Sequence, residues 1–346
     1  MIHVDGAQRS GSGTIVRYAV ALAALAGSPL HLTNARARRS RPGLRPQHVA
    51  SVRACAQLCG AETRGLEVDS REFTFVPERR IRGGRFRWDI GTAGSTTMLA
   101  LGILPLACFA DAPVVARITG GVFQDFAPSP HHMAHVLAPL LERMGAAVEI
   151  RVVRAGYVPR GAGVLELRVR PVRHTLAPLE LAKPGVVRDV SGVAFSSHLG
   201  KRRVSERMAH SCEQHLASEG LSSRIERVLD SEANHPGASL AVWSVSSTGC
   251  RLGADRAGAR RRSSEAIGRF VARSLLEDLH SGATTDRHLA DQLVLFAALA
   301  RGTTRYLAPL PTQHLDTNLW IARRFGARVS SDGRHVEIGG IGREIG

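Results

Sequence analysis

The 346-residue sequence contains almost no lysine. Only Lys183 and Lys201 occur, although the formal net charge at pH 7 is +16. Arginine therefore carries almost all of the positive charge, and its guanidinium group can bind two oxygens of one phosphate, which lysine cannot do. The arginines cluster at residues 36–45 and 260–262. This pattern favours a polyanionic partner, RNA or DNA before a membrane surface, although a genome-wide compositional bias explains the excess equally well.

The sequence also lacks long apolar runs and a regular cysteine pattern. No stretch of eighteen apolar residues occurs, and residues 1–30 lack the order of segments of a signal peptide, so we expect neither a membrane span nor secretion. The five cysteines are odd in number and irregularly spaced, which argues against a disulfide framework. Cys55 and Cys59 are expected on one helix face as small core residues. A reducing cytoplasm fits these features.

Three segments of the chain follow one plan, which indicates an internal repeat. Each begins with a helix led by small or polar residues and continues into a short apolar strand. A proline-containing loop then leads to a second helix, which starts near a histidine and ends at Gly-Ala, where glycine supplies a left-handed cap. The histidines are His48, His131 or His132, and His314. The pattern predicts three α/β units whose helices pack inward around a common core.

Residues 181–281 interrupt this plan. They combine a strand-like run at 240–247 with amphipathic helices near 205–218 and 265–279, separated by loops rich in glycine and charge. We expect a smaller α/β domain inserted before the third unit, because about a hundred residues can hold a modest core. The large three-unit domain would then consist of residues 1–180 and 282–346.

Two loops of the first unit suit phosphate binding. Residues 5–13 (DGAQRSGSG) lead into a helix, where glycine allows close backbone approach and the helix start offers unpaired N–H groups. A plain tight turn explains this loop equally well. Residues 36–48 place five arginines around stiffening prolines. These arginines would bind a phosphate backbone if they face a cleft, and a merely solvated charged loop is the alternative.

The run PSPHHMAH at residues 128–135 resembles a metal site at first sight. His131 or His132 would share a helix face with His135. No carboxylate or cysteine lies close in sequence to complete a metal shell. Histidines at a helix start near a cleft are therefore favoured over metal ligands.

His314 is the candidate nucleophile at the start of the last predicted helix. Asp316 and Asn318 follow it, where they could orient or cap it, and Asp291 and Gln292 begin the preceding helix of the same unit. A lone histidine is usually structural. A neutral imidazole between two helix N-termini could nevertheless attack a phosphate, since its ordinary pKa of about 6.5 leaves it mostly unprotonated at pH 7.

Several ordered strings resemble those of the RNA 3′-terminal phosphate cyclase family. They are DGAQ at 5–8, RPGLRPQH at 41–48, TAGS at 92–95, ITGG at 118–121, GYVPRGAG at 156–163, HLADQ at 288–292 and QHLDTN at 313–318. The resemblance extends from about residue 2 to residue 335. It implies an α/β fold of three units, each with a four-stranded sheet and two helices, plus a smaller inserted domain. It also implies ATP-dependent conversion of an RNA 3′-terminal phosphate to a 2′,3′-cyclic phosphate through a covalent histidine–AMP intermediate.

The resemblance assigns roles to individual residues, with His314 as the nucleophile. The residues expected near ATP are His288, Leu289, Ala290, Asp291, Gln292, Pro128, Leu101, Gln8 and Gly11. The residues expected to meet the RNA end are Arg36, Arg39 and Gln47. A divalent ion, Mg²⁺ or Mn²⁺, is expected to bridge the triphosphate. Its ligands stay unknown, because Ser10 stands where the family usually carries a metal-holding glutamate.

Other positions around the expected nucleotide site also depart from the family. Leu101 stands where bacterial members have a glutamine, His288 replaces an aromatic residue that stacks on adenine, and Phe123 lies in the altered string GGVF. Two alternatives to the cyclase therefore stay open. One is a non-catalytic RNA-binding or ribosome-assembly relative, against which the presence of His314 argues. The other is a nucleotidyl transferase that acts on another phosphorylated acceptor.

Overall fold

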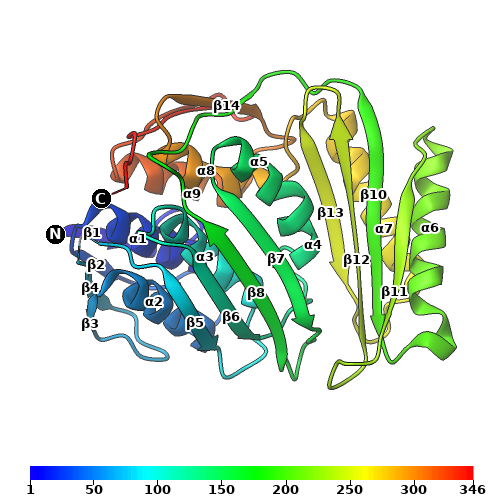
Figure 1. Ribbon diagram of the computed structural model, residues 1–346, viewed down its shortest axis with the longest axis horizontal. Helices are drawn as coiled ribbons and strands as arrows, with labels where there is room; N and C mark the ends of the chain where they lie inside the picture. Colours follow the sequence, from blue (N-terminus) through cyan, green and yellow to red (C-terminus); the bar gives the residue numbers. More distant parts are fainter. Residues whose placement is uncertain (79, 346) are drawn as a thin grey trace.

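The computed structural model describes residues 1–78 and 80–345, and their strands form four sheets of four strands each (Figure 1). The first sheet has the order β1-β2-β4-β3, with β1 and β2 parallel and the other pairs antiparallel. The first unit consists of β1 (Ile2–Asp5), α1 (Gly13–Ala26), β2 (Leu30–Thr33), α2 (Pro46–Cys59), β3 (Glu62–Arg64) and β4 (Phe73–Val76). Both helices end at a left-handed glycine, Gly27 (φ 60°) and Gly60 (φ 64°), as the repeat predicts.

The second unit repeats this arrangement in a sheet of order β5-β6-β8-β7. Its second helix runs without a break from Pro130 to Arg143 and contains one π-helical turn, at Met133–Leu137. The elements are β5 (Gly84–Asp89), α3 (Thr96–Cys108), β6 (Val114–Gly120), α4 (Pro130–His132), α5 (Ala138–Arg143), β7 (Ala147–Arg154) and β8 (Gly163–Arg170).

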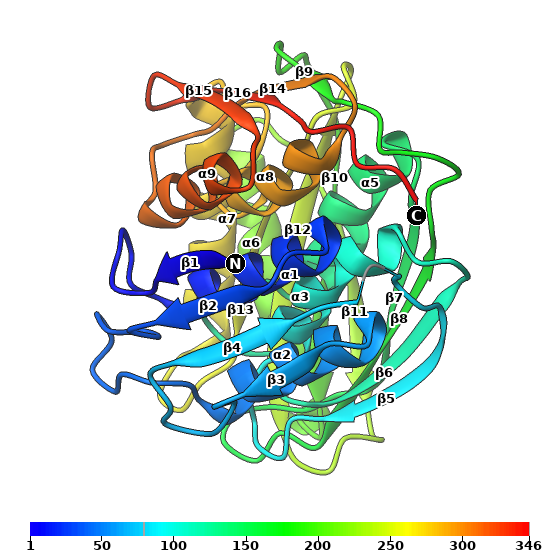
Figure 2. The ribbon, with the colours of Figure 1, turned by 90° about the vertical axis from the view of Figure 1, so that its left-hand side faces the viewer.

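The third unit combines two separate parts of the chain. Strand β9 (Glu180–Leu181) ends at the first residue of the predicted insert and pairs in parallel with β14 in the sheet β15-β16-β14-β9. The remaining elements are α8 (Leu289–Leu299), β14 (Thr303–Leu307), α9 (Gln313–Arg324), β15 (Arg328–Ser331) and β16 (His335–Gly339). In Figure 2, α9 lies directly above β1, and Arg324 Nη2 donates a hydrogen bond to the His3 carbonyl (2.6 Å).

The fourth sheet, of order β11-β10-β12-β13, has two helices of its own. Its elements are β10 (Val187–Ser197), a 3-10 turn (Gly200–Arg202), α6 (Val204–Ser218), β11 (Arg224–Asp230), β12 (Gly237–Ser246), β13 (Arg251–Ala257) and α7 (Ser264–His280). The predicted α/β fold class, with three repeated units and an additional α/β part, is therefore confirmed. The division into domains at residues 181 and 281 stays a prediction.

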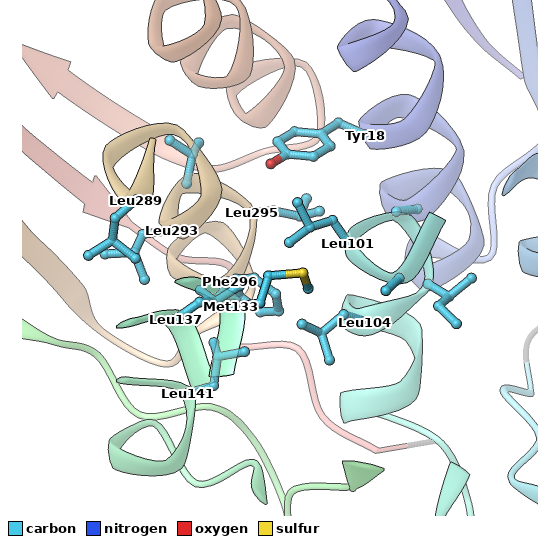
Figure 3. Packing of buried hydrophobic residues seen from close by; sticks show 14 of the residues in the cluster. Tyr18, Leu101, Leu104, Met133, Leu137, Leu141, Leu289, Leu293, Leu295 and Phe296 are labelled. Carbon is cyan, nitrogen blue, oxygen red and sulfur yellow. The ribbon is translucent and has the colours of Figure 1, made fainter. Parts of the chain in front are cut away.

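The core lies where the helices of the three units meet. Helix α1 is buried from Gly13 to Leu25, which is typical of a helix that is surrounded by other elements on all sides. Figure 3 shows Tyr18 of α1, Leu101 of α3, Met133 of the π-helical turn and Leu295 of α8 in this core. This central packing fixes the starts of α1, α8 and α9 relative to one another.

The cysteines belong to this core as well. All five are free and buried, so the interpretation of Cys55 and Cys59 as core residues is confirmed. Burial raises the pKa of the Cys59 thiol to about 12, which keeps it protonated and unreactive. Within the described residues, no helix has both the length and the apolar character needed to cross a bilayer.

Candidate active site

His314 lies exposed in the first turn of α9. The helix is capped by Thr312, whose hydroxyl accepts a hydrogen bond from the Leu315 N–H (3.0 Å). Among the described residues, no hydrogen bond or ion pair engages the His314 ring. Asp316 and Asn318 do not orient it, contrary to expectation. Asp316 instead forms an ion pair with Arg9 (3.3 Å), and Asn318 donates to the Asp291 carbonyl (2.9 Å).

The electrostatic surroundings keep His314 neutral. Partial burial lowers the pKa of its imidazole, and the neighbouring guanidinium groups of Arg17 and Arg39 and the His288 ring lower it further. The ring therefore carries a free lone pair at neutral pH. An exposed, uncharged imidazole next to cations is suited to attack a phosphorus atom whose oxygens those cations bind.

Arg17 is a functional candidate that the sequence analysis missed. Its side chain points from the buried helix α1, the residue is 7% exposed, and its Nε has no hydrogen-bond partner among the described residues. Burial lowers its pKa to about 10, and the charges of Arg36 and Arg39 also lower it. A buried guanidinium with an unpaired donor is suited to receive an anion. The only sequence signal is one charge in an otherwise apolar helix.

The glycine at the start of α1 makes room for this guanidinium. A Cβ atom placed on Gly13 would lie 2.1 Å from His48 Nε2 and 3.3 Å from Arg17 Nη1. Any side chain at this position would therefore displace His48, which starts α2, or the arginine. The end of the phosphate-suited loop, the buried arginine and the second helix of the first unit thus meet at one point.

Of the expected RNA-end residues, Arg36 and Arg39 lie in the loop before α2, and Gln47 lies in the first turn of α2. Arg36 Nη1 donates to the carbonyls of Arg41 (2.8 Å) and Gly43 (2.7 Å), while Arg39 is exposed. Gln47 accepts a hydrogen bond from the Ser95 N–H (3.1 Å), which links the start of α2 to the TAGS segment of the second unit. The charge of Arg39 lowers the pKa of both Arg17 and His314. Arg39 and His314, which the sequence predicts as site residues, therefore lie near Arg17, which it does not predict.

The loop at residues 5–13 is joined to the start of α9. The Ser10 N–H donates to the Thr317 hydroxyl (3.1 Å), and the Ser10 side chain bonds only that of Ser12 (2.9 Å) among the described residues. Gly11 has a left-handed backbone (φ +53°), and a Cβ atom there would collide with the Arg38 side chain at 2.5 Å. The loop therefore packs closely between the arginine loop and the helix that carries His314.

The segment at residues 288–292 is fixed by a buried acid that the sequence analysis also missed. The carboxylate of Asp286 accepts hydrogen bonds from the N–H groups of His288 (2.8 Å), Leu289 (2.8 Å) and Gly253 (2.9 Å). It also contacts His132 Nε2 (2.9 Å), and both side chains are at most 1% exposed. Asp286 thus caps α8 and joins it to α4 and β13.

The ends of this segment differ in their access to solvent. His288 is exposed, Leu289 and Ala290 are buried in the core, and Gln292 is buried with its Oε1 unpaired among the described residues. The Tyr306 hydroxyl donates to the Ala290 carbonyl (2.6 Å). In Figure 3 the hydroxyl of Tyr18 points from α1 toward α8, and it lies 3.5 Å from the Asp291 carbonyl.

Asp291 is the group of this segment whose pKa is strongly shifted. Burial and the negative charge of Asp286 raise the pKa of its carboxyl to about 7, against the opposing effects of Arg17 and His132. The side chain is therefore partly protonated at neutral pH. A charge that changes this close to the buried arginine alters the field that an incoming phosphate meets.

Three other predicted nucleotide contacts form no hydrogen bond with the His314 ring. The side chain of Leu101 is 6% exposed and packs in the core of Figure 3. Gln8 donates to Asp5 (3.1 Å) and lines a cavity of about 290 Å³ between β1 and α9. Pro128 precedes Ser129, whose hydroxyl caps α4. Among the described residues, no hydrogen bond or ring stacking joins any of these side chains to the His314 ring.

The histidines at residues 131–135 have separate partners. His131 stacks on Phe123 (ring centroids 5.8 Å apart), His132 pairs with Asp286, and His135 stacks on Trp243 (4.0 Å). Burial lowers the pKa of His131 to about 4, so this ring is neutral. Within residues 1–78 and 80–345, no group of three or more His, Cys, Asp or Glu side chains is arranged to hold a metal ion.

Comparison with known proteins identifies the family. A sequence model described as "RNA 3'-terminal phosphate cyclase" matches residues 8–330. The chain belongs to the RNA 3′-terminal phosphate cyclase family. A protein of that name from Hyperthermus butylicus is 40% identical over 329 residues, which cover 93% of this chain and 91% of the relative. Another from Pyrobaculum aerophilum is 35% identical over 346 residues, 99% of each chain.

A solved structure resembles the cyclase-family chain only loosely. The enolpyruvyl transferase NikO from Streptomyces tendae has a TM-score of 0.41 and 13% sequence identity. The match covers 99% of this chain and 48% of that structure, so the chain spans about half the length of NikO.

The family model and the named relatives confirm the resemblance to the cyclase family that the short strings indicated.

Proposed function

We propose that this protein converts an RNA 3′-terminal phosphate to a 2′,3′-cyclic phosphate at the expense of ATP, with His314 as the nucleophile. The observation that carries the proposal is the neutral, exposed imidazole of His314 in the electrostatic field of Arg17 and Arg39. The chain belongs to a family named for the cyclisation of RNA 3′-terminal phosphates, which supports this activity.

The chemistry proceeds by three displacements at phosphorus. A ring nitrogen of His314 forms a bond to the α-phosphorus of ATP, and the bond to pyrophosphate breaks. An oxygen of the RNA 3′-phosphate then attacks the same phosphorus and releases the imidazole, which leaves AMP joined to the RNA end. Finally the neighbouring 2′-hydroxyl attacks the terminal RNA phosphorus, loses its proton and releases AMP. Imidazole suits both early steps because it is a good nucleophile and a good leaving group.

The arginines supply the positive charge that these steps need. Arg17, Arg36 and Arg39 act electrostatically on one another, so their charges converge near the RNA end and the nucleotide phosphates. The unpaired Nε of Arg17 gives this cluster a buried donor that solvent does not satisfy. Donors that are already in place lower the cost of charge that develops on phosphate oxygens.

The residues present fit ATP better than they fit a metal held by the protein. The cationic cluster beside His314 suits a triphosphate, and His288 offers an exposed ring at the start of α8. A divalent ion does not find a carboxylate at Ser10, and Asp316 is engaged by Arg9. We therefore route no step through a protein-bound metal. An ion that enters with ATP would be held mainly by the phosphates themselves.

The buried contacts behind the site keep α8 and α9 in register. Asp286 caps α8, Tyr306 holds the Ala290 carbonyl, and Asn318 joins α9 to the Asp291 carbonyl. These residues position the segment at residues 288–292 without touching the reacting atoms. The free, buried cysteines also favour a reducing compartment, which we propose is the cytoplasm.

The test uses RNA that is labelled at its 5′ end and carries a 3′-phosphate. With ATP and Mg²⁺ or Mn²⁺, the terminal 3′-phosphate should become resistant to phosphatase, and the labelled RNA should carry a 2′,3′-cyclic end. RNA with a 3′-hydroxyl should not react, and RNA whose terminal sugar lacks the 2′-hydroxyl should not cyclise. Transfer of AMP to a different phosphorylated acceptor would favour a nucleotidyl transferase. RNA binding without any reaction of ATP would favour the non-catalytic relative.

A further inference from the structure

Phe126 is the most exposed of the large apolar side chains that the structure describes. It is 102% exposed, whereas the next, Val186, is 74% exposed. Its backbone is also left-handed (φ +65°), a conformation that is costly for a bulky residue. A ring that is held in solvent by a strained backbone conformation is not explained by packing of the core.

An ion pair holds the loop that displays this ring. The Asp125 carboxylate accepts two hydrogen bonds from Arg262, at Nη1 (3.1 Å) and Nη2 (2.8 Å), and lies 3.5 Å from Arg256 Nε. The Asp125 and Arg262 side chains are only 22–23% exposed. Arg262 Nη1 also donates to the Ala257 carbonyl at the end of β13. The loop after β6 is thus clamped to the loop after β13, and Phe126 follows directly.

The same clamp brings the second arginine cluster beside Phe126. Arg260 and Arg261 are exposed, and neither forms an ion pair or hydrogen bond with another described residue. The two acidic side chains of this region are already engaged, Asp125 by the arginines and Asp255 by the Ser129 N–H (2.7 Å). The surface around the ring therefore carries uncompensated positive charge.

The proposed reaction centre lies at a distance from this surface along β13. Gly253 donates to Asp286, which caps α8, whereas Ala257 at the other end of the strand contacts Arg262. Four residues of strand correspond to about 13 Å. Figure 1 shows β13 alongside α4, whose Ser129 cap lies between these two points. The loop that displays the ring therefore lies nearer the end of β13 than the residue of this strand that contacts the cap of α8.

We propose that Phe126, Arg260 and Arg261 form a platform that binds single-stranded RNA away from its 3′ end. A nucleobase would stack on the ring of Phe126, and flanking phosphates would pair with the two arginines. Exposed aromatic rings beside unpaired cations are the usual elements of such binding, because every base has a flat face and every nucleotide a charge. The inference rests on the proposed function, since it assumes that the 3′ end of the same strand enters the His314 site.

The platform predicts a dependence on RNA length. The Phe126→Ala protein should show an increase of about 5- to 100-fold in KM for a twelve-nucleotide RNA 3′-phosphate, the range expected for one lost base stack. Its KM for a dinucleotide 3′-phosphate and its rate of reaction with ATP alone should stay unchanged. Phe126→Trp should retain the wild-type KM, and Val186→Ala is the matched control at another exposed apolar side chain. Arg260→Ala with Arg261→Ala should reduce the salt dependence of binding to the longer RNA.

Several outcomes would overturn the platform. An equal increase in KM for both RNA lengths, or an unchanged KM for the longer one, contradicts it. A slower reaction with ATP alone would assign the ring to the adenine of ATP instead. Binding of the longer RNA is measured separately by fluorescence anisotropy. If the wild-type protein forms no cyclic product but Phe126→Ala weakens this binding, the proposed function fails while the platform stands.

Discussion

His48 and His314 occupy corresponding positions in the first and third units, and their surroundings are opposite. His48 is 3% exposed, and its Nδ1 accepts a hydrogen bond from the Arg45 N–H (3.1 Å) to form a capping box. Burial lowers its pKa well below the usual range, and the charges of Arg17 and Arg36 add to this effect. His314 is exposed, and Thr312 caps its helix instead. One histidine therefore holds a helix start, and the other is free to react.

His132 of the second unit shows a third outcome for the same position. It is 2% exposed and paired with Asp286, which caps α8 of the third unit. The repeat places a histidine at each helix start, and the neighbouring unit determines what it does. A histidine at one of these helix starts is therefore available for chemistry only where no neighbouring group hydrogen-bonds its ring.

The largest expected effect distinguishes His314 from His48. His314→Asn should reduce turnover by at least about a thousandfold, because a nucleophile is lost, and should leave the thermal midpoint nearly unchanged, because the side chain is exposed. His48→Ala should instead lower the free energy of unfolding by about 1–3 kcal/mol through loss of a buried hydrogen bond. Its kcat per folded molecule should stay close to wild type. Steady-state kinetics and thermal unfolding measure both, and a stable His48→Ala protein without activity would contradict the assignment.

The pair between His132 and Asp286 should have the next largest effect. Asp286→Asn should lower the free energy of unfolding by about 3–5 kcal/mol, because it leaves a buried charge uncompensated. Although burial alone would raise it, the charge and hydrogen bond of His132 lower the pKa of Asp286 to about 2. The carboxylate's contribution is thus complete above the ordinary value of 3.8 and is lost as the pH falls toward 2.

His132 determines the other side of this pH window. Burial lowers its pKa, but the charge and hydrogen bond of Asp286 outweigh burial and raise it above 6.5. Its contribution is complete below 6.5 and is lost as the pH rises through the raised pKa. The difference in thermal midpoint between wild type and Asp286→Asn should therefore be largest between the two ordinary values. A difference that does not vary from pH 3 to pH 9 would mean that the pair is not charged.

The fall in the reaction rate at low pH, the acid limb of the pH profile, should depend on Arg39. Because surrounding protein and nearby cations lower the pKa of His314, the rate of its reaction with ATP should stay level through pH 7 and fall only below 6.5. Arg39→Ala removes one of these charges and should move the limb toward higher pH. Arg41→Ala, in the same exposed loop, is the matched control, since its charge does not contribute to the shift at His314. A limb that both substitutions move equally would contradict a local effect of Arg39.

The smallest expected effect concerns the metal. Ser10→Glu restores a carboxylate to the loop without removing the backbone bond between Ser10 and Thr317. It should lower the Mg²⁺ or Mn²⁺ concentration that gives half-maximal activity and raise the activity at limiting metal, whereas Ser10→Gln should do neither. Unchanged or lower activity with glutamate would mean that the site has been rebuilt around serine.

The sequence predicts the repeated units well because each one repeats local signals. Periodic apolar residues, prolines in the loops and glycines after the second helices depend only on neighbours along the chain, and the strand Leu30–Thr33 and the helix starts near His48 and His314 lie where expected. The same signals do not reveal partners from distant segments. Asp286 meets His132 across 154 positions, and Asp316 meets Arg9 across 307.

In the candidate site, too, local patterns predict some residues but do not predict contacts between distant segments. The motif at residues 313–318 indicates His314, but nothing in the local pattern shows that Asn318 contacts Asp291 or that Leu101 is in the core. Arg17 escapes sequence reasoning because one charge in an apolar helix is normally an exposed residue, and its burial depends on how three units pack. The exposure of Phe126 depends likewise on the clamp between Asp125 and Arg262.

The most direct test of the account is the covalent state of residue 314. The protein is incubated with ATP labelled at the α-phosphate and a divalent ion, and the adduct is located by peptide mapping. We predict an acid-labile, alkali-stable adduct at His314 that is absent from His314→Asn, present in His48→Ala, and discharged by RNA with a 3′-phosphate. An adduct at any other residue, or an adduct that persists in His314→Asn, would contradict the account.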